Sequence, residues 1–444
     1  MSFIEAAIKE HKTSTMYRIA VDAEEYDRQR NITIMSYRKL LYTMSGKAVP
    51  DNYSANYKMA SNFFNRFVTQ ENQYLLGNGV TLEKKSNKEK LGSDFDNVIQ
   101  QAGRNALVQG VSFGFWNNDH LEVFKLTEFV PLYDEENGAL MAGIRYWQVD
   151  ADKPLRATLY ELDGYTEYIK FENKDMTVKE EKRPYILITR ASAVDNPEIV
   201  DGKNYPGFPI IPFWGNPHRQ SELIGLRENI DAYDLIKSGF ANDLDDVSQV
   251  YWLIKNAGGM DDLDVAKFLD RVKTTRAAVV TDTGSGAEIE PHTIDIPYES
   301  RIAYLERLEQ DMYNDFQALN VTSLQGGQKT ATEIDAAYLP LDLKADQFEY
   351  CVLEFLNGIF TIAGIEDKPT FTRNKINNPT EAMNTLMLAA PYLDDEYITK
   401  KACTILGDPD AADKILKQKA ADEMQRFDEV NINADAGQSA SANG

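Results

Sequence analysis

The spacing of apolar residues predicts that the first part of the chain is mostly helical. Over residues 1–75, hydrophobic positions recur at intervals of three and four, which is typical of amphipathic helices. The segment Gly46–Asp51 is the one expected break. A helix is expected over Ala60–Leu76, where the turn residues Gly77-Asn78-Gly79 would stop it. A further helix is expected over Asp94–Gln109.

From Val111 to Thr189 the period of the pattern falls toward two, which indicates β-strands. Turn residues at Asn137-Gly138 and Asp163-Gly164 separate the apolar runs. The expected strands lie at 121–124, 144–147 and 157–160. Together with the preceding helices they predict an α+β body. Four prolines between residues 201 and 220 predict an extended connector after it, because proline restricts both its own backbone and that of the residue before it.

Helical spacing returns after the prolines and lasts much longer. An apolar stripe from Leu223 to Ile254 predicts a helix of about 30 residues, which Gly258-Gly259 would end. A small unit is expected over residues 260–297. Within it, the pattern predicts a helix near 263–272 and strands at 277–281 and 287–292.

Two more long helices are expected after the small unit. The first covers residues 298–319, and a polar loop at 320–330 follows it. The second begins at about Thr332, and Pro340 should kink it. Shorter helices are expected over residues 379–428. The chain as a whole is therefore predicted to be α+β and largely helical.

Composition narrows the class of protein. The 444 residues are 43% hydrophobic, which is enough for one large core or several modest ones. The formal net charge is −23. Such a chain does not grip nucleic acid by releasing counterions, although it could form a conduit along which nucleic acid slides. The N-terminus lacks an apolar signal core, and no stretch is suited to span a bilayer. We therefore expect a cytosolic protein without a membrane partner.

Sequence motifs for catalysis or cofactor binding are weak. Residues Gly110–Gly114 fit the G-x-S-x-G pattern, but a helix precedes them and strands follow, the reverse of a nucleophile elbow. We interpret them as a tight turn. The four histidines are scattered and no P-loop occurs, so neither a metal nor a cofactor is predicted. Cys351 and Cys403 lie in apolar helical contexts, which favours buried thiols in a reducing compartment.

Acidic residues gather in two places along the first long helix. Asp243, Asp245 and Asp246 lie near its middle, and a second group, Asp261, Asp262 and Asp264, lies near its end. A divalent-cation site is one interpretation, and a solvated acidic face is the other. An acidic wall would itself keep a passing polyanion mobile. A carboxylate pair for acid–base chemistry also stays open, which makes an acidic hydrolase an alternative function.

The polar loop carries the most suggestive short motif. Its glycines permit motion, and its single lysine could meet a phosphate without holding it strongly. An ordinary mobile surface loop would look the same. The candidate residues of this loop are Gln325, Gly326, Gly327, Gln328 and Lys329.

Several segments, in this order, resemble the portal proteins of tailed phages that infect Gram-positive hosts. The closest is IDAYDLIKSGFANDLDD at residues 230–246, which is similar to a stem-helix pattern. The other segments are NRFVTQENQYLLG at 65–77, LVQGVSFGF at 107–115, PIIPFWGNPHRQSEL at 209–223, and Phe371-Thr372-Arg373 with Asn377 and Glu381. The resemblance covers roughly residues 30–425, and the order of the segments is more specific than any one of them.

The resemblance implies a portal fold with named parts. These are an α+β wing (1–222), stem helix 1 (223–256), an α/β clip (257–297), stem helix 2 (298–319), a tunnel loop (320–331), a kinked wing helix (332–364), a crown (365–428) and a disordered tail (429–444). It also implies a non-enzymatic subunit of a homo-oligomeric ring, usually of twelve. Double-stranded DNA would pass through the ring during packaging and ejection.

The resemblance implies partners as well. The ring would dock the terminase large subunit and later a head–tail adaptor. It would also contact the major capsid and scaffold proteins. The protein would be assembled in the host cytoplasm and lie at one capsid vertex of the virion. Another minor capsid or scaffold protein is an alternative, although a scaffold should lack the strand-rich region before residue 190.

Overall fold

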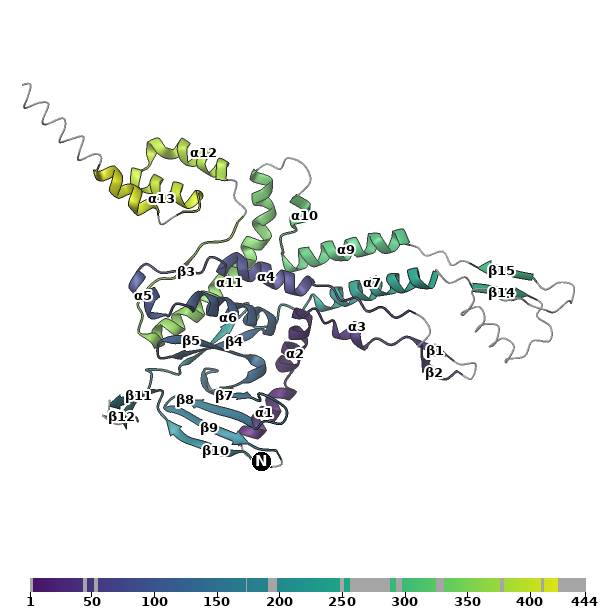
Figure 1. Cartoon of the computed structure of the whole chain (residues 1–444), viewed down its shortest axis with the longest axis horizontal. Coiled ribbons are helices and arrows are strands. Elements are labelled where there is room, and N and C mark those ends of the chain that lie inside the picture. The colour runs from purple at the N-terminus through teal and green to yellow at the C-terminus, as the bar shows by residue number, and fades with distance from the viewer. Residues whose placement is uncertain are drawn as a thin grey trace, which may run out of the picture. The chain divides into compact units, whose positions relative to one another are not determined.

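The computed structural model describes most of the chain in two compact units, residues 1–373 and 374–444 (Figure 1). The fold is α+β and largely helical, as the sequence predicts. The described residues are 3–42, 46–51, 55–172, 174–190, 198–247, 251–255, 288–292, 298–324, 331–375, 379–408 and 411–421.

The N-terminal part contains three helices and then leaves the helical pattern. The helices are α1 (Phe3–Thr13), α2 (Thr15–Asp27) and α3 (Ile32–Ser36). After them, β1 (Leu40–Tyr42) and β2 (Ala48–Pro50) form an antiparallel hairpin, and residues 55–62 have no regular secondary structure. The predicted break at Gly46–Asp51 is non-helical, but the prediction of helix on either side of it is wrong for residues 37–42 and 55–62. Contacts with a distant helix, given below, hold residues 55–62 and override the local pattern.

The largest core lies between helices and a three-stranded sheet. The helices are α4 (Phe63–Leu76), α6 (Phe95–Gln109) and α11 (Ala331–Ala363), and the sheet has the order β13–β4–β5. The strands are β4 (Val111–Asn117), β5 (His120–Lys125) and β13 (Ile210–Trp214). Phe213 of β13 stacks on Phe355 of α11 with ring centroids 4.6 Å apart. Aromatic packing thus joins the sheet to the long helix.

Strand β13 corrects the prediction of an extended connector at 201–220. Its residues pair with β4 over the register from Ile210 opposite Phe115 to Trp214 opposite Val111. Pro212 lies inside β13, which is the edge strand of this sheet. An edge strand tolerates proline because backbone N–H groups on its outer side have no neighbouring strand to bond. The prolines therefore mark a sheet edge as well as a connection.

A second sheet is a five-stranded antiparallel meander in the order β10–β9–β8–β7–β6. Its strands are β6 (Phe129–Tyr133), β7 (Leu140–Trp147), β8 (Leu155–Glu161), β9 (Gly164–Lys170) and β10 (Thr177–Arg183). The three strands predicted from alternation fall on β5, β7 and β8. Ile4 and Ile8 of α1 pack against this sheet. A hairpin of β11 (Ile186–Arg190) and β12 (Glu198–Lys203) follows.

Two long helices, α7 (Arg227–Val247) and α9 (Tyr298–Phe316), lie side by side (Figure 1). The helix predicted over Leu223–Ile254 begins later, at Arg227, and ends earlier, at Val247. Part of its predicted C-terminal end, Tyr251–Lys255, forms strand β14. A short apolar run does not by itself distinguish helix from strand, which explains the error. Strand β14 pairs with β15 (Glu288–His292), close to the second predicted strand. The helix at 263–272 and the strand at 277–281 lie outside the described residues.

The remaining elements follow the predicted order. Helix α10 (Val321–Leu324) corrects the polar loop predicted at 320–330, whose first part is helical. Helix α11 follows, and its 33 residues include Pro340. The kink at Pro340 stays a prediction. Two short strands, β3 (Val80–Thr81) and β16 (Thr370–Phe371), pair with each other, and α5 (Lys85–Lys90) follows β3 in the chain. The second unit contains α12 (Pro379–Ala389), α13 (Asp395–Ile405) and a helical stretch at 411–421. The tail at 429–444 lies outside the described residues.

Candidate functional site

Residues 55–62, here called the strap, run extended along α7 and bind it through backbone N–H groups. Three polar side chains, each one helical turn from the next on α7, accept these hydrogen bonds. The bonds run from Ser61 N to Asp234 Oδ1 (2.9 Å), from Met59 N to Ser238 Oγ (3.0 Å) and from Tyr57 N to Asn242 Oδ1 (2.6 Å). Four helical residues rise about 6 Å and two extended residues rise about 6.6 Å, so the two spacings match.

The same face of α7 also receives α2 and α3. The Tyr26 hydroxyl donates to Asp231 Oδ1 at 2.5 Å, and Asn31 Nδ2 donates to Asp234 Oδ2 at 2.8 Å. Burial, followed by the hydrogen bond to Asp231, raises the pKa of Tyr26 to about 12. Burial also raises the pKa of the fully buried Asp234, and the hydrogen bonds from Asn31 and Ser61 oppose that rise. This face of α7 is thus a buried polar interface.

The opposite face of α7 meets α9. Asp243 forms an ion pair with Arg301, and Asn229 Nδ2 donates to Asp315 Oδ2 at 3.2 Å. Asp243, predicted to belong to an acidic wall, is therefore partly neutralised by a cross-helix contact. Asp245 is exposed near the end of α7. The side chain of Asp246 lies outside the described residues, as do Asp261, Asp262 and Asp264, so the acidic wall stays a prediction.

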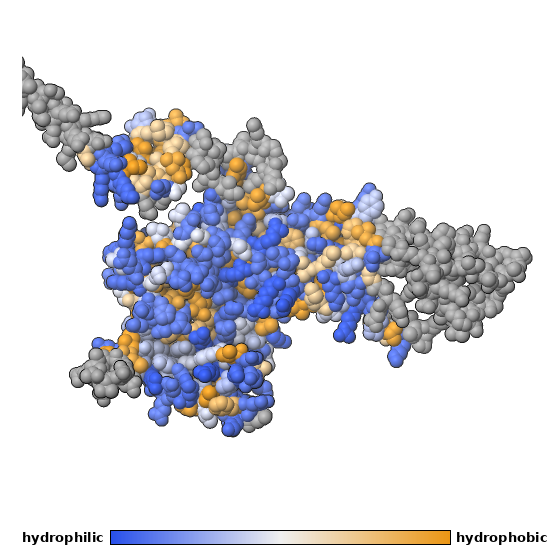
Figure 2. All heavy atoms as spheres, viewed as in Figure 1, coloured by the Kyte–Doolittle hydropathy of each residue, from blue (hydrophilic) through white to orange (hydrophobic). Residues whose placement is uncertain are grey.

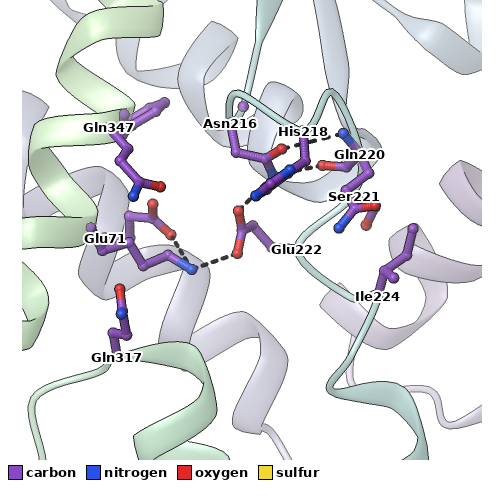
Figure 3. A pocket seen from close by; sticks show the side chains of 12 residues that line it. Glu71, Asn216, His218, Gln220, Ser221, Glu222, Ile224, Gln317 and Gln347 are labelled. Atoms are coloured by element: carbon purple, nitrogen blue, oxygen red, sulfur yellow. Dashed lines mark hydrogen bonds and ion pairs between the residues drawn. The ribbon is translucent and has the colours of Figure 1, made fainter.

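A buried charge cluster joins α4, α11 and the segment that leads into α7. Lys344 Nζ lies 2.5 Å from Glu222 Oε2 and 3.5 Å from Glu71 Oε2. It also lies 3.6 Å from the ring centroid of Phe316, the last residue of α9. In Figure 3, Glu71 and Glu222 come from different elements and face one another, and dashed lines mark the ion pair that each carboxylate forms with the lysine. The ammonium group of Lys344 therefore links α11 to three other parts of the sequence.

The cluster borders a polar cavity of about 140 Å³. Asn216 donates from Nδ2 to Glu222 Oε1 at 2.7 Å, and the amides of Gln317 and Gln347 also line the space (Figure 3). Burial raises the pKa of Glu71 to about 8; the Lys344 ammonium opposes the rise and the Glu222 carboxylate adds to it. Glu71 is therefore the carboxyl that holds a proton near neutral pH, while Lys344 pairs with Glu222. A lysine between the two carboxylates leaves no free pair for acid–base catalysis at this position.

A second charge cluster fastens the end of the first unit to α11. Arg373 contacts three carboxylates on α11, one turn apart: Asp342 at 2.9 Å, Asp346, and Glu349 at 3.1 Å. The Tyr74 hydroxyl donates to Asp342 Oδ1 at 2.7 Å. Because the first unit ends at Arg373, this contact fixes the position from which the chain leaves that unit.

The predicted loop residues Gln325, Gly326, Gly327, Gln328 and Lys329 lie outside the described residues. Their approach is well defined. Gln70 Nε2 donates to Leu319 O at 3.0 Å, and Leu319 N donates to Gln70 Oε1 at 2.9 Å. This pair of bonds ties the end of the α9 segment to α4. The chain therefore enters the loop from a fixed position beside the Lys344 cluster.

The remaining candidates have structural roles. Ser112 of the G-x-S-x-G match is fully buried, and its hydroxyl donates to Ala102 O at 2.8 Å. Gly110 ends α6 with φ +89°, so the interpretation as a helix-to-strand turn is confirmed. Cys351 and Cys403 are free and buried, as predicted. Among the described residues, no three histidine, cysteine or acidic side chains are grouped to hold a metal.

Sequence reasoning missed the strap and both charge clusters. Glu71, Glu222 and Lys344 are far apart in the chain, so no local pattern relates them. A signal for the strap existed: Asp231, Asp234, Ser238 and Asn242 recur at helical spacing in the 230–246 segment.

No helix in the described part of the chain is both long and apolar enough to cross a membrane.

Comparisons with known proteins match nearly the whole chain. Residues 6–425 match the family described as phage portal protein, SPP1 Gp6-like. The portal protein of Clostridium phage phiCD119 is 25% identical over 360 residues, which are 74% of this chain and 77% of that protein. The portal protein of Bacillus phage SPP1 is 24% identical over 386 residues, 79% of this chain and 73% of that protein.

Two particle necks are among the solved structures to which the chain is similar. The neck of an empty GTA particle, computed with C6 symmetry, gives a TM-score of 0.41 at 11% identity, covering 79% of this chain and 90% of that one. The neck of a native GTA particle, computed with C12 symmetry, gives 0.39 at 9% identity, covering 78% and 90%.

Proposed function

Because the chain belongs to the SPP1 Gp6-like phage portal family, we propose that it forms a closed ring at one capsid vertex and that double-stranded DNA passes through this ring during packaging and ejection. The observation that carries the proposal is the family match over residues 6–425. Proteins of this family are structural components of the virion, so the role proposed is that of a channel and assembly subunit rather than an enzyme.

The described elements fit the parts of such a subunit. Helices α7 and α9 would be the stem, and the chain between them, including β14 and β15, would form the clip. The α+β body before α7, together with α11, would be the wing. The second unit would belong to the crown. A clip of about 40 residues is too small to bury a core alone, so neighbouring subunits would complete it.

Exposed apolar side chains on the stem helices support assembly. Those that lie more than 40% exposed are Leu235, Leu244, Tyr298, Ile302 and Tyr304. Figure 2 shows apolar residues among the polar ones over this region. Large apolar side chains left exposed on helices favour burial against another subunit. A closed ring buries the same two surfaces on every subunit.

The loop at 320–331 would project into the channel, where Lys329 would meet DNA phosphates transiently. The acidic residues Asp243, Asp245 and Asp246 would line the stem and keep the DNA mobile by repulsion. Replacement of Lys329 by Ala should change DNA packaging or retention without preventing ring assembly. Loss of the ring in that variant would contradict the assignment of this loop.

The partners follow from the same proposal. Energy for packaging would come from a separate terminase, whose large subunit would dock on the clip, and a head–tail adaptor would replace it later. Major capsid and scaffold proteins would surround the ring during assembly in the host cytoplasm.

The experiment that tests the function is the mass and shape of the purified chain. Light scattering and negative-stain electron microscopy should show rings of about a dozen subunits with a central hole. A monomer of 50.2 kDa that stays monomeric at high concentration and in the presence of its capsid proteins would overturn the proposal.

A further inference from the structure

The segment between α2 and α4 has a charge opposite to that of the chain. Residues 28–62, here called the basic arm, contain six Lys or Arg residues and a single acidic residue, Asp51, which gives a net charge of +5. The whole chain carries −23. Arg28 and Arg30, at the start of the arm, form ion pairs with Glu24 and Glu25 of α2, so an acidic partner would meet the basic residues further along the arm.

Two described parts of the basic arm, α3 and the strap, contact α7. The strap is the last part of the arm, and it binds the face of α7 that carries Asp234, Ser238 and Asn242. The contacts of α7 with α9 come from Asn229 and Asp243, which lie roughly opposite on the helix at 3.6 residues per turn. Helix α7 is therefore sandwiched between the basic arm and α9 (Figure 1).

The outer side of the basic arm is exposed and partly apolar. Tyr37 is 48% exposed and Leu40 is 50% exposed, and Met35 is exposed beside them. Arg38, between Tyr37 and Leu40, is exposed and forms no ion pair with any described residue. This surface thus combines apolar side chains with an uncompensated positive charge.

The outer side of α9 is complementary to it. The helix contains five acidic residues and two arginines, which gives a net charge of −3. The side of the helix away from Arg301 and Asp315, which both contact α7, carries the exposed Ile302, and Glu306 follows Ile302 one turn later. Glu306 is exposed and forms no ion pair within the part of the chain that the structure describes.

We propose that the basic arm of one copy docks on the outer face of α9 of a second copy. The two surfaces lie on opposite sides of α7, as a head-to-tail interface requires. Charge complementarity favours a second copy over nucleic acid, because phosphates would gain nothing from the exposed apolar side chains of the arm, whereas Ile302 of α9 offers them an apolar partner beside Glu306. The inference rests on the proposed ring and names which surfaces close it.

A charge swap tests the proposal on the full chain. Arg38→Glu and Glu306→Arg should each raise the subunit concentration needed for half-assembly about tenfold, and the double variant should return within about threefold of the native value. Mass photometry across a dilution series measures this concentration. The matched controls are Arg156→Glu and Glu135→Arg, which reverse exposed charges on the meander sheet and on a loop and should leave assembly unchanged.

A second measurement locates the contact without relying on charge. A chain with Leu40→Cys is mixed with a chain with Ile302→Cys under mild oxidation, and a disulfide-linked pair of chains is expected. The interface is overturned if the native chain forms rings, both single charge reversals assemble like the controls, and no cross-link appears. That result would leave the proposed ring intact. Absence of rings from the native chain would instead overturn the proposed function. A third outcome is that the native chain binds duplex DNA and that Arg38→Glu abolishes this binding without changing assembly. That outcome would identify nucleic acid as the occupant and also overturn the interface.

Discussion

The strap gives a prediction that concerns single backbone amides. Ser238 is 5% exposed, and its hydroxyl accepts the N–H of Met59 at 3.0 Å. Replacement of Ser238 by Ala removes this acceptor and leaves the rest of α7 unchanged. The Met59 amide should then exchange faster with solvent, because opening of the strap no longer breaks a hydrogen bond.

The size of the effect follows from the environment of the bond. A neutral hydrogen bond contributes about 1 kcal/mol net, which corresponds to about a fivefold change in protection. A buried donor left without any partner costs up to about 3 kcal/mol, or roughly 150-fold. Met59 is 38% exposed, so water can reach its backbone and replace part of the lost bond. We therefore expect about a fivefold acceleration for Met59.

Hydrogen exchange with electron-transfer fragmentation resolves the amides concerned. The amides of Lys58 and Ala60 alternate with those bound to α7 and should keep their rates in the variant. Ser300→Ala makes the same substitution at an exposed position of α9 and serves as the control. Equal acceleration of all strap amides would indicate general loosening, and no acceleration of Met59 would refute the reasoning that α7 side chains hold the strap.

Three further perturbations test other parts of the fold. The pKa of Glu71 is about 8 in the folded state, against a usual value of 4.5, so the folded chain holds one more proton than the unfolded chain between these values. The free energy of unfolding should therefore fall as the pH rises through this range, by up to about 1.4 kcal/mol per pH unit. Melting temperatures at pH 6 and pH 8 should show a smaller fall for Glu71→Gln, and an unchanged fall would count against the assignment. Gly110→Ala places a Cβ 2.9 Å from Ser221 N at φ +89° and should cost about 3 kcal/mol in chemical unfolding, whereas a loss under 1 kcal/mol would mean that the turn relaxes. Arg373→Lys keeps the charge but not the three-way contact with α11, so hydrogen exchange at Phe371–Arg373 should accelerate; native protection there would show that the other contacts suffice.

The periodicity of apolar residues predicted the elements that pack one apolar face against the core and expose the other face to solvent. Helices α6, α9 and α11 each bury one apolar stripe, and the strands of the meander alternate along one buried face. For such elements the pattern of apolar positions is a direct consequence of the packing. The pattern could not assign Tyr251–Lys255, because a short run rich in apolar residues fits a buried strand and the end of a helix equally well.

The charge clusters could not be predicted from any local pattern. Lys344 is one lysine on a long helix, and only the fold brings it to Glu71 and Glu222. Arg373 likewise finds its three carboxylates through the path of the chain, although their spacing along α11 does place them on one face. Residues that meet from distant parts of a chain carry no periodic signal, and pairwise proximity has to come from the structure.

Helix α7 falls between these two cases. It carries an apolar stripe, which periodicity detected, and a polar stripe at the same spacing, which periodicity alone would assign to solvent. The polar stripe is buried, since Asp234, Ser238 and Asn242 are at most 5% exposed. Its members are short side chains with oxygen acceptors, whereas a solvated helix face favours long Lys and Glu side chains. Short acceptor side chains repeated at helical spacing opposite an apolar stripe therefore indicate a helix with partners on both faces. An extended segment that donates alternate N–H groups fits such a stripe, because the rise of four helical residues nearly equals the rise of two extended residues.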